Sequence, residues 1–328
     1  MPKFIALDRR ACQDVAAINE YVAERSDGWQ LIEGALPKLV RLFAQYPKYY
    51  AEPSQLRIMP ADAELSSKLY GLYDSSKSYF RYRKVPRKHG KNGCCPYCGI
   101  KGSISVDHYL PRALSKYPCF SVLSANLVPA CSSCQGHKAT FSPKTIGRFV
   151  RLPRVRPRNR DDELEESKFR LSERRILHPY FDAFLSERVL VAQVAFGKDG
   201  LPVLVSLQPR LNLRGRVRRL ISFHLERLHV FERAQGEVAH LHNSIVKGLS
   251  RTLEKVEDVE EALQVQLSAA EARGGSKNFF DALYIRALIV RKDFHARLFE
   301  SALVTEAPLI RKSMPRAARY PPPKRFRR

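Results

Sequence analysis

Two cysteine pairs, Cys95-Pro-Tyr-Cys98 and Cys131-Ser-Ser-Cys134, are separated by thirty-two residues and decide how this part of the chain folds. Four thiolates with this spacing suit Zn²⁺, which forms closed tetrahedral cages in structural sites. The repeated spacing argues against four unrelated buried cysteines. A disulfide framework would require an oxidising compartment that nothing else in the sequence indicates. The sequence therefore predicts a structural zinc site formed by Cys95, Cys98, Cys131 and Cys134.

Between the two pairs the sequence predicts a small β-β-α unit. Ile104–His108 alternates apolar and polar residues, which is typical of a short strand. Residues 126–130 are the expected returning strand, and a helix is expected to begin near Ser132, a good N-cap residue. Because neighbouring residues of a strand point to opposite faces, Asp107 and His108 can serve different chemical functions.

This segment resembles the HNH, or ββα-metal, endonuclease superfamily in its zinc-knuckle branch. The resemblance covers residues 91–145, under a fifth of the chain. It is carried by Cys95-Pro-Tyr-Cys98, Val106-Asp-His-Tyr-Leu-Pro111, Asn126-Leu-Val-Pro-Ala-Cys131 and Lys138. The later string His178-Pro-Tyr-Phe-Asp182 also resembles one found downstream of this motif in bacterial members.

The resemblance implies a role for each site residue. His108 would be the general base that deprotonates the attacking water, and Asp107 would bind a catalytic Mg²⁺ or Mn²⁺. Asn126 would fix the loop and orient His108. The family usually has Asn or His directly after the last knuckle cysteine, where this chain has Gln135. The second ligand of the catalytic cation is therefore either Gln135 or His137.

The chemistry of these residue types agrees with phosphodiester hydrolysis. An imidazole with an ordinary pKa near 6.5 can act as a base at neutral pH. A hard cation prefers oxygen ligands, so a carboxylate would hold it while the thiolates keep the zinc. A histidine that merely forms hydrogen bonds inside a zinc-stabilised core is the alternative for His108, and the neighbouring Asp107 and the later Asn126 favour catalysis.

The charge of the chain points to a polyanionic partner. Lysines and arginines number 57 against 33 acids, a formal net charge of +24. Basic runs at 81–91 and 148–160 flank the predicted nuclease unit, and a third occupies 311–328. Such side chains would position a phosphate backbone without reading its sequence. The predicted nucleic-acid contacts are Arg81, Arg83, Lys84, Arg87, Lys88, Lys138, Arg151, Arg154 and Arg156.

Hydrophobic periodicity predicts a mostly helical α+β protein around the zinc-stapled ββα centre. Helices are expected at 14–23, 31–46, 65–80, 216–242, 244–273 and 277–303, and a β-hairpin at 189–207. The predicted parts are a helical region at 1–90, the nuclease domain at 91–147, a linker at 148–166, a hairpin and helical bundle at 167–310, and a basic tail at 311–328. The remaining histidines at 224, 229, 240 and 242 are expected on helix surfaces or in the core.

The sequence therefore predicts an HNH endonuclease that cuts DNA, with a bacterial defence or mobile-element role suggested by the resemblance. A non-catalytic zinc-stabilised nucleic-acid-binding module and an RNA-cleaving effector are the alternatives. No run of eighteen apolar residues and no secretory signal is found, so we expect a cytoplasmic protein without a membrane partner. The chain has no phosphate-cradling glycine loop, so an ATPase partner would be a separate subunit.

Overall fold

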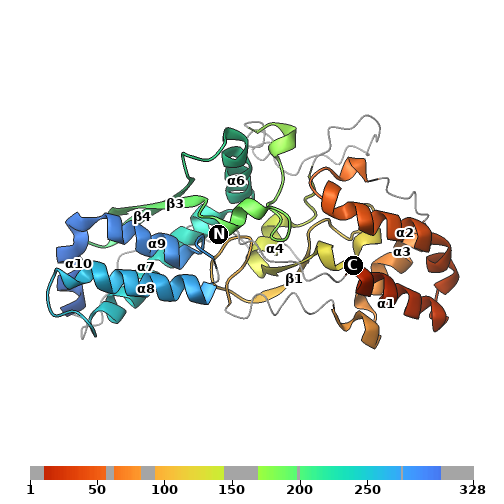
Figure 1. Cartoon of the computed structure of the whole chain (residues 1–328), viewed down its shortest axis with the longest axis horizontal. Helices are drawn as coiled ribbons and strands as arrows, with labels where there is room; N and C mark the ends of the chain where they lie inside the picture. Colours follow the sequence, from red (N-terminus) through yellow and green to blue (C-terminus); the bar gives the residue numbers. More distant parts are fainter. Residues whose placement is uncertain are drawn as a thin grey trace, which may run out of the picture.

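The computed structural model describes residues 11–56, 63–82, 93–143, 169–197, 200–274 and 276–303. Figure 1 shows three parts along the long axis of the molecule. Helices α1 to α3 occupy one end, strand β1 and helix α4 lie in the middle, and α7 to α10 with the β3–β4 hairpin occupy the other end. No helix among the described residues is long and apolar enough to cross a membrane.

The first part consists of α1 (Ala11–Ala23), α2 (Trp29–Tyr49) and α3 (Ala63–Gly71). The buried residues of α2 recur every three or four positions, from Ile32 to Tyr46, so one face of this helix packs into the core. The third helix is shorter than the predicted 65–80. It ends at Gly71, a poor helix former, and the 3₁₀ turn Leu72–Asp74 follows.

In the centre, β1 (Ile104–His108) pairs with β2 (Leu127–Cys131) in an antiparallel ladder, and α4 (Ser132–Lys138) follows directly. This is the predicted β-β-α order. In the ladder, Asp107 lies opposite Val128 and His108 lies opposite Leu127. The zinc-ligand pair Cys131 and Cys134 therefore sits at the junction of β2 and α4.

The last part contains the second sheet, an antiparallel hairpin of β3 (Leu190–Phe196) and β4 (Pro202–Pro209). The helices that follow are α6 (Gly215–Arg227), α7 (Val230–Leu249), α8 (Asp258–Gly274), α9 (Phe280–Val290) and α10 (His295–Leu303). The prediction of three long helices was wrong in three places. His229, with a positive φ of 50°, lies between α6 and α7. Helix α7 runs on to Leu249, past the predicted break at 243, and α8 begins only at Asp258. The turn Lys292–Phe294 separates α9 from α10.

Two small antiparallel sheets within a mostly helical chain agree with the predicted α+β class. The divisions expected at 91–147 and 167–310 remain predictions. A hydrogen bond from Tyr50 connects the first helical part to a buried ion pair between Arg175 and Asp182. Arg175 donates two hydrogen bonds of 2.5 Å to Asp182, and the Tyr50 hydroxyl of the first part donates to the same carboxylate at 3.1 Å.

Three of the buried histidines have lowered pKa values. Burial lowers the pKa of His224 and of His242 to about 4. Burial, with a contribution from the charge of Arg175, also lowers the pKa of His178 well below its ordinary value. Each receives or makes a hydrogen bond in its neutral form. Leu177 N–H donates to Nδ1 of His224, Tyr180 N–H donates to Nδ1 of His178, and Nδ1 of His242 contacts the Tyr284 hydroxyl.

The folded protein should therefore lose stability as pH falls from about 6.5 to about 4. Below pH 6.5 the histidines of the unfolded chain bind protons, whereas the buried rings of the folded protein stay neutral. Unfolding therefore becomes more favourable as the pH falls. At pH 5 His224 and His242 each contribute up to about 2 kcal/mol to this loss. Urea unfolding at pH 7 and pH 5 measures it, and His242→Gln should reduce the difference. An unchanged free energy of unfolding between the two pH values would contradict the prediction.

Candidate metal and catalytic site

Four cysteine side chains form a cage at the centre of the molecule. The sulfur atoms of Cys95, Cys98, Cys131 and Cys134 all lie within 4.8 Å of one another, and all four residues are buried. Sγ of Cys98 is 3.9 Å from Sγ of Cys131. Four converging sulfurs are the donor set that structural zinc prefers, so these residues fit a zinc ion. Within the described part of the chain, no other group of three or more His, Cys, Asp or Glu side chains converges in this way.

Arg233 of α7 contacts two sulfurs of the cage, and no sequence motif predicts this contact. Its Nη1 donates to Sγ of Cys134 at 3.1 Å, and its Nη2 donates to Sγ of Cys131 at 3.2 Å. Burial lowers the pKa of Arg233, but the cysteine sulfurs raise it by more, so the net pKa is raised. A zinc ion with four thiolates carries two net negative charges, and this guanidinium would offset one of them.

The first knuckle is also fixed to α6 through His224. Nε2 of His224 lies 2.7 Å from the carbonyl oxygen of Tyr97, and Nδ1 accepts from Leu177 N–H at 3.0 Å. Because a carbonyl only accepts, the ring proton is on Nε2. His224, expected either on a helix surface or in the core, is buried and links the first knuckle to α6.

Asp107 lies at the end of β1 with its carboxylate largely buried. Nζ of Lys138 is 3.0 Å from Oδ2, and the Tyr97 hydroxyl donates to the same oxygen at 3.2 Å. Burial raises the pKa of Asp107, while the ammonium of Lys138 opposes that rise. Lys138 is 1% exposed and also donates to the carbonyl of His108 at 2.7 Å. In this structure Lys138, predicted among the nucleic-acid contacts, faces Asp107 and not solvent.

His108 is held by two contacts of its ring. Nε2 lies 2.9 Å from the carbonyl oxygen of Ser121, so this nitrogen carries the proton and Nδ1 keeps its lone pair. The ring of Tyr73 meets it edge to face with centroids 4.5 Å apart. Burial lowers the pKa of His108 to about 4, with a further contribution from the charge of Arg112. The imidazole is therefore neutral at pH 7.

Asn126 is fully buried and uses both ends of its amide. Nδ2 donates to the carbonyls of Leu110 and Phe120 at 3.0 and 3.1 Å. Oδ1 accepts from Leu110 N–H and from the Tyr46 hydroxyl, each at 2.7 Å. These four bonds close the loop between β1 and β2 and attach it to α2.

The two alternative cation ligands lie in different surroundings. Nε2 of Gln135 donates to Ser105 Oγ at 2.5 Å and to the Ala130 carbonyl at 3.1 Å. Ser105 and Asp107 share a face of β1, so Gln135 lies on the Asp107 side of the sheet. His137 is exposed, and its ring stacks on that of His229 with centroids 4.4 Å apart. The structure brings Gln135, and not His137, to the face that carries Asp107.

Arg112 is a further basic residue beside the site. Its guanidinium lies over the rings of Tyr70 and Tyr73, 4.1 and 4.8 Å from their centroids, and pairs with Asp74 at 2.7 Å. It follows the Asp107-to-Pro111 string directly, a position that could have drawn attention in the sequence. Arg112 thus adds positive charge near His108 from the loop side.

Most of the residues predicted to contact the nucleic-acid backbone lie outside the described part of the chain. This holds for Arg83, Lys84, Arg87, Lys88, Arg151, Arg154, Arg156 and the tail at 311–328. Arg81 is described, and it is exposed.

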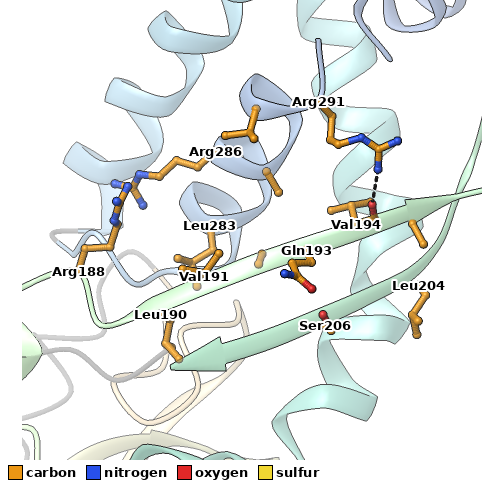
Figure 2. A pocket seen from close by; sticks show the side chains of 14 residues that line it. Arg188, Leu190, Val191, Gln193, Val194, Leu204, Ser206, Leu283, Arg286 and Arg291 are labelled. Atoms are coloured by element: carbon orange, nitrogen blue, oxygen red, sulfur yellow. Dashed lines mark hydrogen bonds between the residues drawn. The ribbon is translucent and has the colours of Figure 1, made fainter. Parts of the chain in front are cut away.

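A groove of about 640 Å³ lies elsewhere, between the β3–β4 hairpin and α9 (Figure 2). Arg188 and Arg286 lie at one end, and Arg291 at the other donates to the Val194 carbonyl at 3.0 Å. Its lining contains no His, Cys, Asp or Glu. The groove therefore offers neither a metal ligand nor a general base of these types, and the candidate site remains the centre around the cysteine cage.

Comparison with known proteins yields a short similarity. The chain is 49% identical over 41 residues to "Protein ea31" of Escherichia phage lambda, which is 12% of this chain and 13% of that protein. The chain thus matches only a small part of the length of this relative. No protein-family model matches the chain, and no solved structure matches it.

Replacing Arg233 by Gln should weaken zinc retention, because two of the cage sulfurs lose their charged donor. We expect zinc to be removed about tenfold more readily by a competing chelator, in line with the effect of outer-shell partners in other metal sites. A colorimetric zinc-release titration measures this. Lys247→Gln, an exposed residue of the same helix, is the matched control. Equal retention in both variants would refute a role for Arg233 at the cage.

Proposed function

We propose that this protein is a metal-dependent HNH endonuclease that hydrolyses phosphodiester bonds in DNA. The observation that carries the proposal is the state of His108. Its Nε2–H is bound to the Ser121 carbonyl, its Nδ1 keeps a lone pair, and Asp107 is the preceding residue on the same strand. Hydrolysis of a phosphate ester requires a base that activates water and a carboxylate that can hold a cation. His108 and Asp107 are residues of these types, and the cysteine cage belongs to the same β-β-α unit.

His108 would take the proton from the attacking water at Nδ1. General-base assistance of this kind contributes about 10²–10⁴-fold to a rate. The pKa of His108 near 4 ensures the unprotonated form at neutral pH. The negative charge of a bound phosphodiester would raise the pKa of His108 toward about 7. His108 would therefore be a stronger base when the substrate is bound. The Ser121 carbonyl fixes the ring so that Nδ1 remains the reactive nitrogen.

Asp107 would hold the catalytic cation, with the amide oxygen of Gln135 as the second protein ligand. The donor chemistry fits Mg²⁺ or Mn²⁺, because such ions are commonly held through one or two carboxylates together with water and substrate phosphates. When bound, the cation would neutralise charge that develops on the phosphate oxygens. The ammonium of Lys138 opposes the rise in the pKa of Asp107 that burial causes, and Asn126 holds the loop between β1 and β2.

A binding module without catalysis is the second candidate, and a specific observation favours it. Lys138 already neutralises Asp107 at 3.0 Å, and Gln135 is engaged with Ser105 and Ala130. In that case the zinc-stabilised fold would only dock on nucleic acid. An RNA-cleaving effector would use the same site on another substrate. A defence or mobile-element role, and a separate ATPase partner, rest on the family resemblance alone.

Nicking of supercoiled plasmid with Mg²⁺ or Mn²⁺ tests the proposal. Wild-type protein should nick, and His108→Ala and Asp107→Ala should each lower the rate at least 100-fold at unchanged zinc content and melting temperature. His240→Ala, which removes an exposed histidine of α7, is the control and should retain activity. If wild type and both site variants are equally inert on DNA and RNA yet still bind DNA, the binding module is correct.

The choice between the two cation ligands has its own test. Gln135→Ala should raise the Mg²⁺ concentration needed for half-maximal nicking about tenfold or more, because a ligand oxygen is lost. His137→Ala should leave that concentration unchanged, since its ring stacks on His229 away from Asp107. The reverse pattern in a metal titration of both variants would make His137 the ligand.

A further inference from the structure

Helix α6 and the residues before it carry a dense group of arginines that the functional site does not use. Residues 210–219 contain five arginines and no acid. Arg214, Arg216, Arg218 and Arg219 are exposed, and we name these four the arginine face. The opposite side of the helix is buried through residues such as Leu220 and Ile221. The helix is therefore amphipathic, with its charge concentrated toward solvent.

Three of these arginines are without a partner among the described residues. Arg219 donates to Glu173 at 2.6 Å, and Glu173 is 2% exposed. The side chains of Arg214, Arg216 and Arg218 make no hydrogen bond or ion pair with the part of the chain that the structure describes. Like charges spaced within one helical turn repel and destabilise a helix. Since no described acid balances these three charges, an external anion is a natural counterpart.

The chemistry of the face favours a phosphate backbone over an acidic protein. Protein interfaces rely on buried apolar and aromatic area at their centre. The exposed large apolar side chains of the described chain include none within α6 and a single one, Leu211, just before it. Dense charge with so little apolar area suits a polyanion whose binding comes from phosphate contacts and counterion release. Arginine is also suited to phosphate because its guanidinium can donate two parallel hydrogen bonds.

The arginine face is attached to the candidate catalytic centre through defined contacts. His224 of the same helix binds the Tyr97 carbonyl at 2.7 Å, and the Tyr97 hydroxyl binds Asp107. At the C-terminal end, Phe223 contacts Phe141 with centroids 5.6 Å apart. Figure 1 shows α6 standing beside α4 above the centre of the molecule. A strand bound on α6 would thus have a fixed position relative to Asp107.

We propose that the arginine face of α6 binds the phosphate backbone of duplex DNA and so positions the substrate at the Asp107–His108 site. This inference rests on the proposed endonuclease function for its biological meaning, but the binding itself does not require cleavage. It adds Arg214, Arg216 and Arg218 to the basic runs that the sequence indicated.

Binding of a labelled 30-base-pair duplex by full-length His108→Ala protein, followed by anisotropy across a salt series, tests the inference. Adding Arg214→Gln, Arg216→Gln and Arg218→Gln should lower the slope of log affinity against log salt by about 2.7, about 0.9 for each lost phosphate contact. Affinity near 0.15 M salt should fall about 10–100-fold. The control triple, Lys247→Gln, Arg251→Gln and Lys255→Gln, removes the same charge from exposed residues elsewhere.

The inference is supported if only the α6 triple lowers the slope, at unchanged zinc content and melting temperature. It is overturned if both triples lower the slope equally, because net charge would then explain binding. It is also overturned if neither triple changes the slope, or if the α6 triple abolishes binding of an acidic peptide while duplex binding is unaffected. Nicking by the same variants with His108 intact is scored separately. Duplex binding through α6 without nicking would refute the endonuclease alone.

Discussion

The convergence of four cysteine sulfurs is the constraint on which the rest of the structure depends. The first knuckle precedes β1 and the second spans the junction of β2 and α4, so one ion held by both would close the whole β-β-α unit. A sheet of two five-residue strands is too small to be stable by itself. Structural zinc contributes on the order of 10–16 kcal/mol in small finger domains, enough to offset that weakness. The catalytic candidates Asp107 and His108 take their positions from this strand pair.

Around the cage, long-range polar contacts attach the other parts of the chain. Arg233 reaches the sulfurs from α7, His224 holds the first knuckle from α6, and Tyr46 binds Asn126 from α2. Each of these groups is buried or half-buried, so breaking its contact would leave an unsatisfied polar group away from water. The centre is thus attached to both ends of the molecule, which gives the candidate site a rigid support.

The electrostatics of the site follow from burial combined with a few charges. His108 is kept neutral by desolvation, while Asp107 is balanced by Lys138. Two adjacent residues thus lie in different electrostatic surroundings, as a general base and a cation ligand require. The same surroundings leave room for the binding-module alternative, since Lys138 can serve as the permanent counter-ion of Asp107. Over the whole sequence 57 lysines and arginines stand against 33 acids, in keeping with the proposed polyanionic partner.

Local pattern in the sequence determined the cysteine quartet, β1, the start of α4 and the hairpin. These elements depend on spacing, alternation and turn residues, which are properties of neighbouring positions. The sequence pattern also predicted the helical parts at the two ends of the molecule. Individual helices there are shorter than predicted, because they end at Gly71, near His229 and at the turn Lys292–Phe294. Helix boundaries there depend on packing that periodicity does not encode.

Only the tertiary structure decided which distant side chains complete the centre. Arg233 lies 99 residues from Cys134 and belongs to no motif, and Lys138 faces Asp107 although its charge suggested a surface position. Gln135 leaves α4 toward the face of β1 that carries Asp107, whereas the ring of His137 stacks on His229. The reason is physical. Hydrogen bonds and desolvation depend on distances between atoms brought together by the fold, and a linear pattern of residue types fixes those distances only within a few turns of chain.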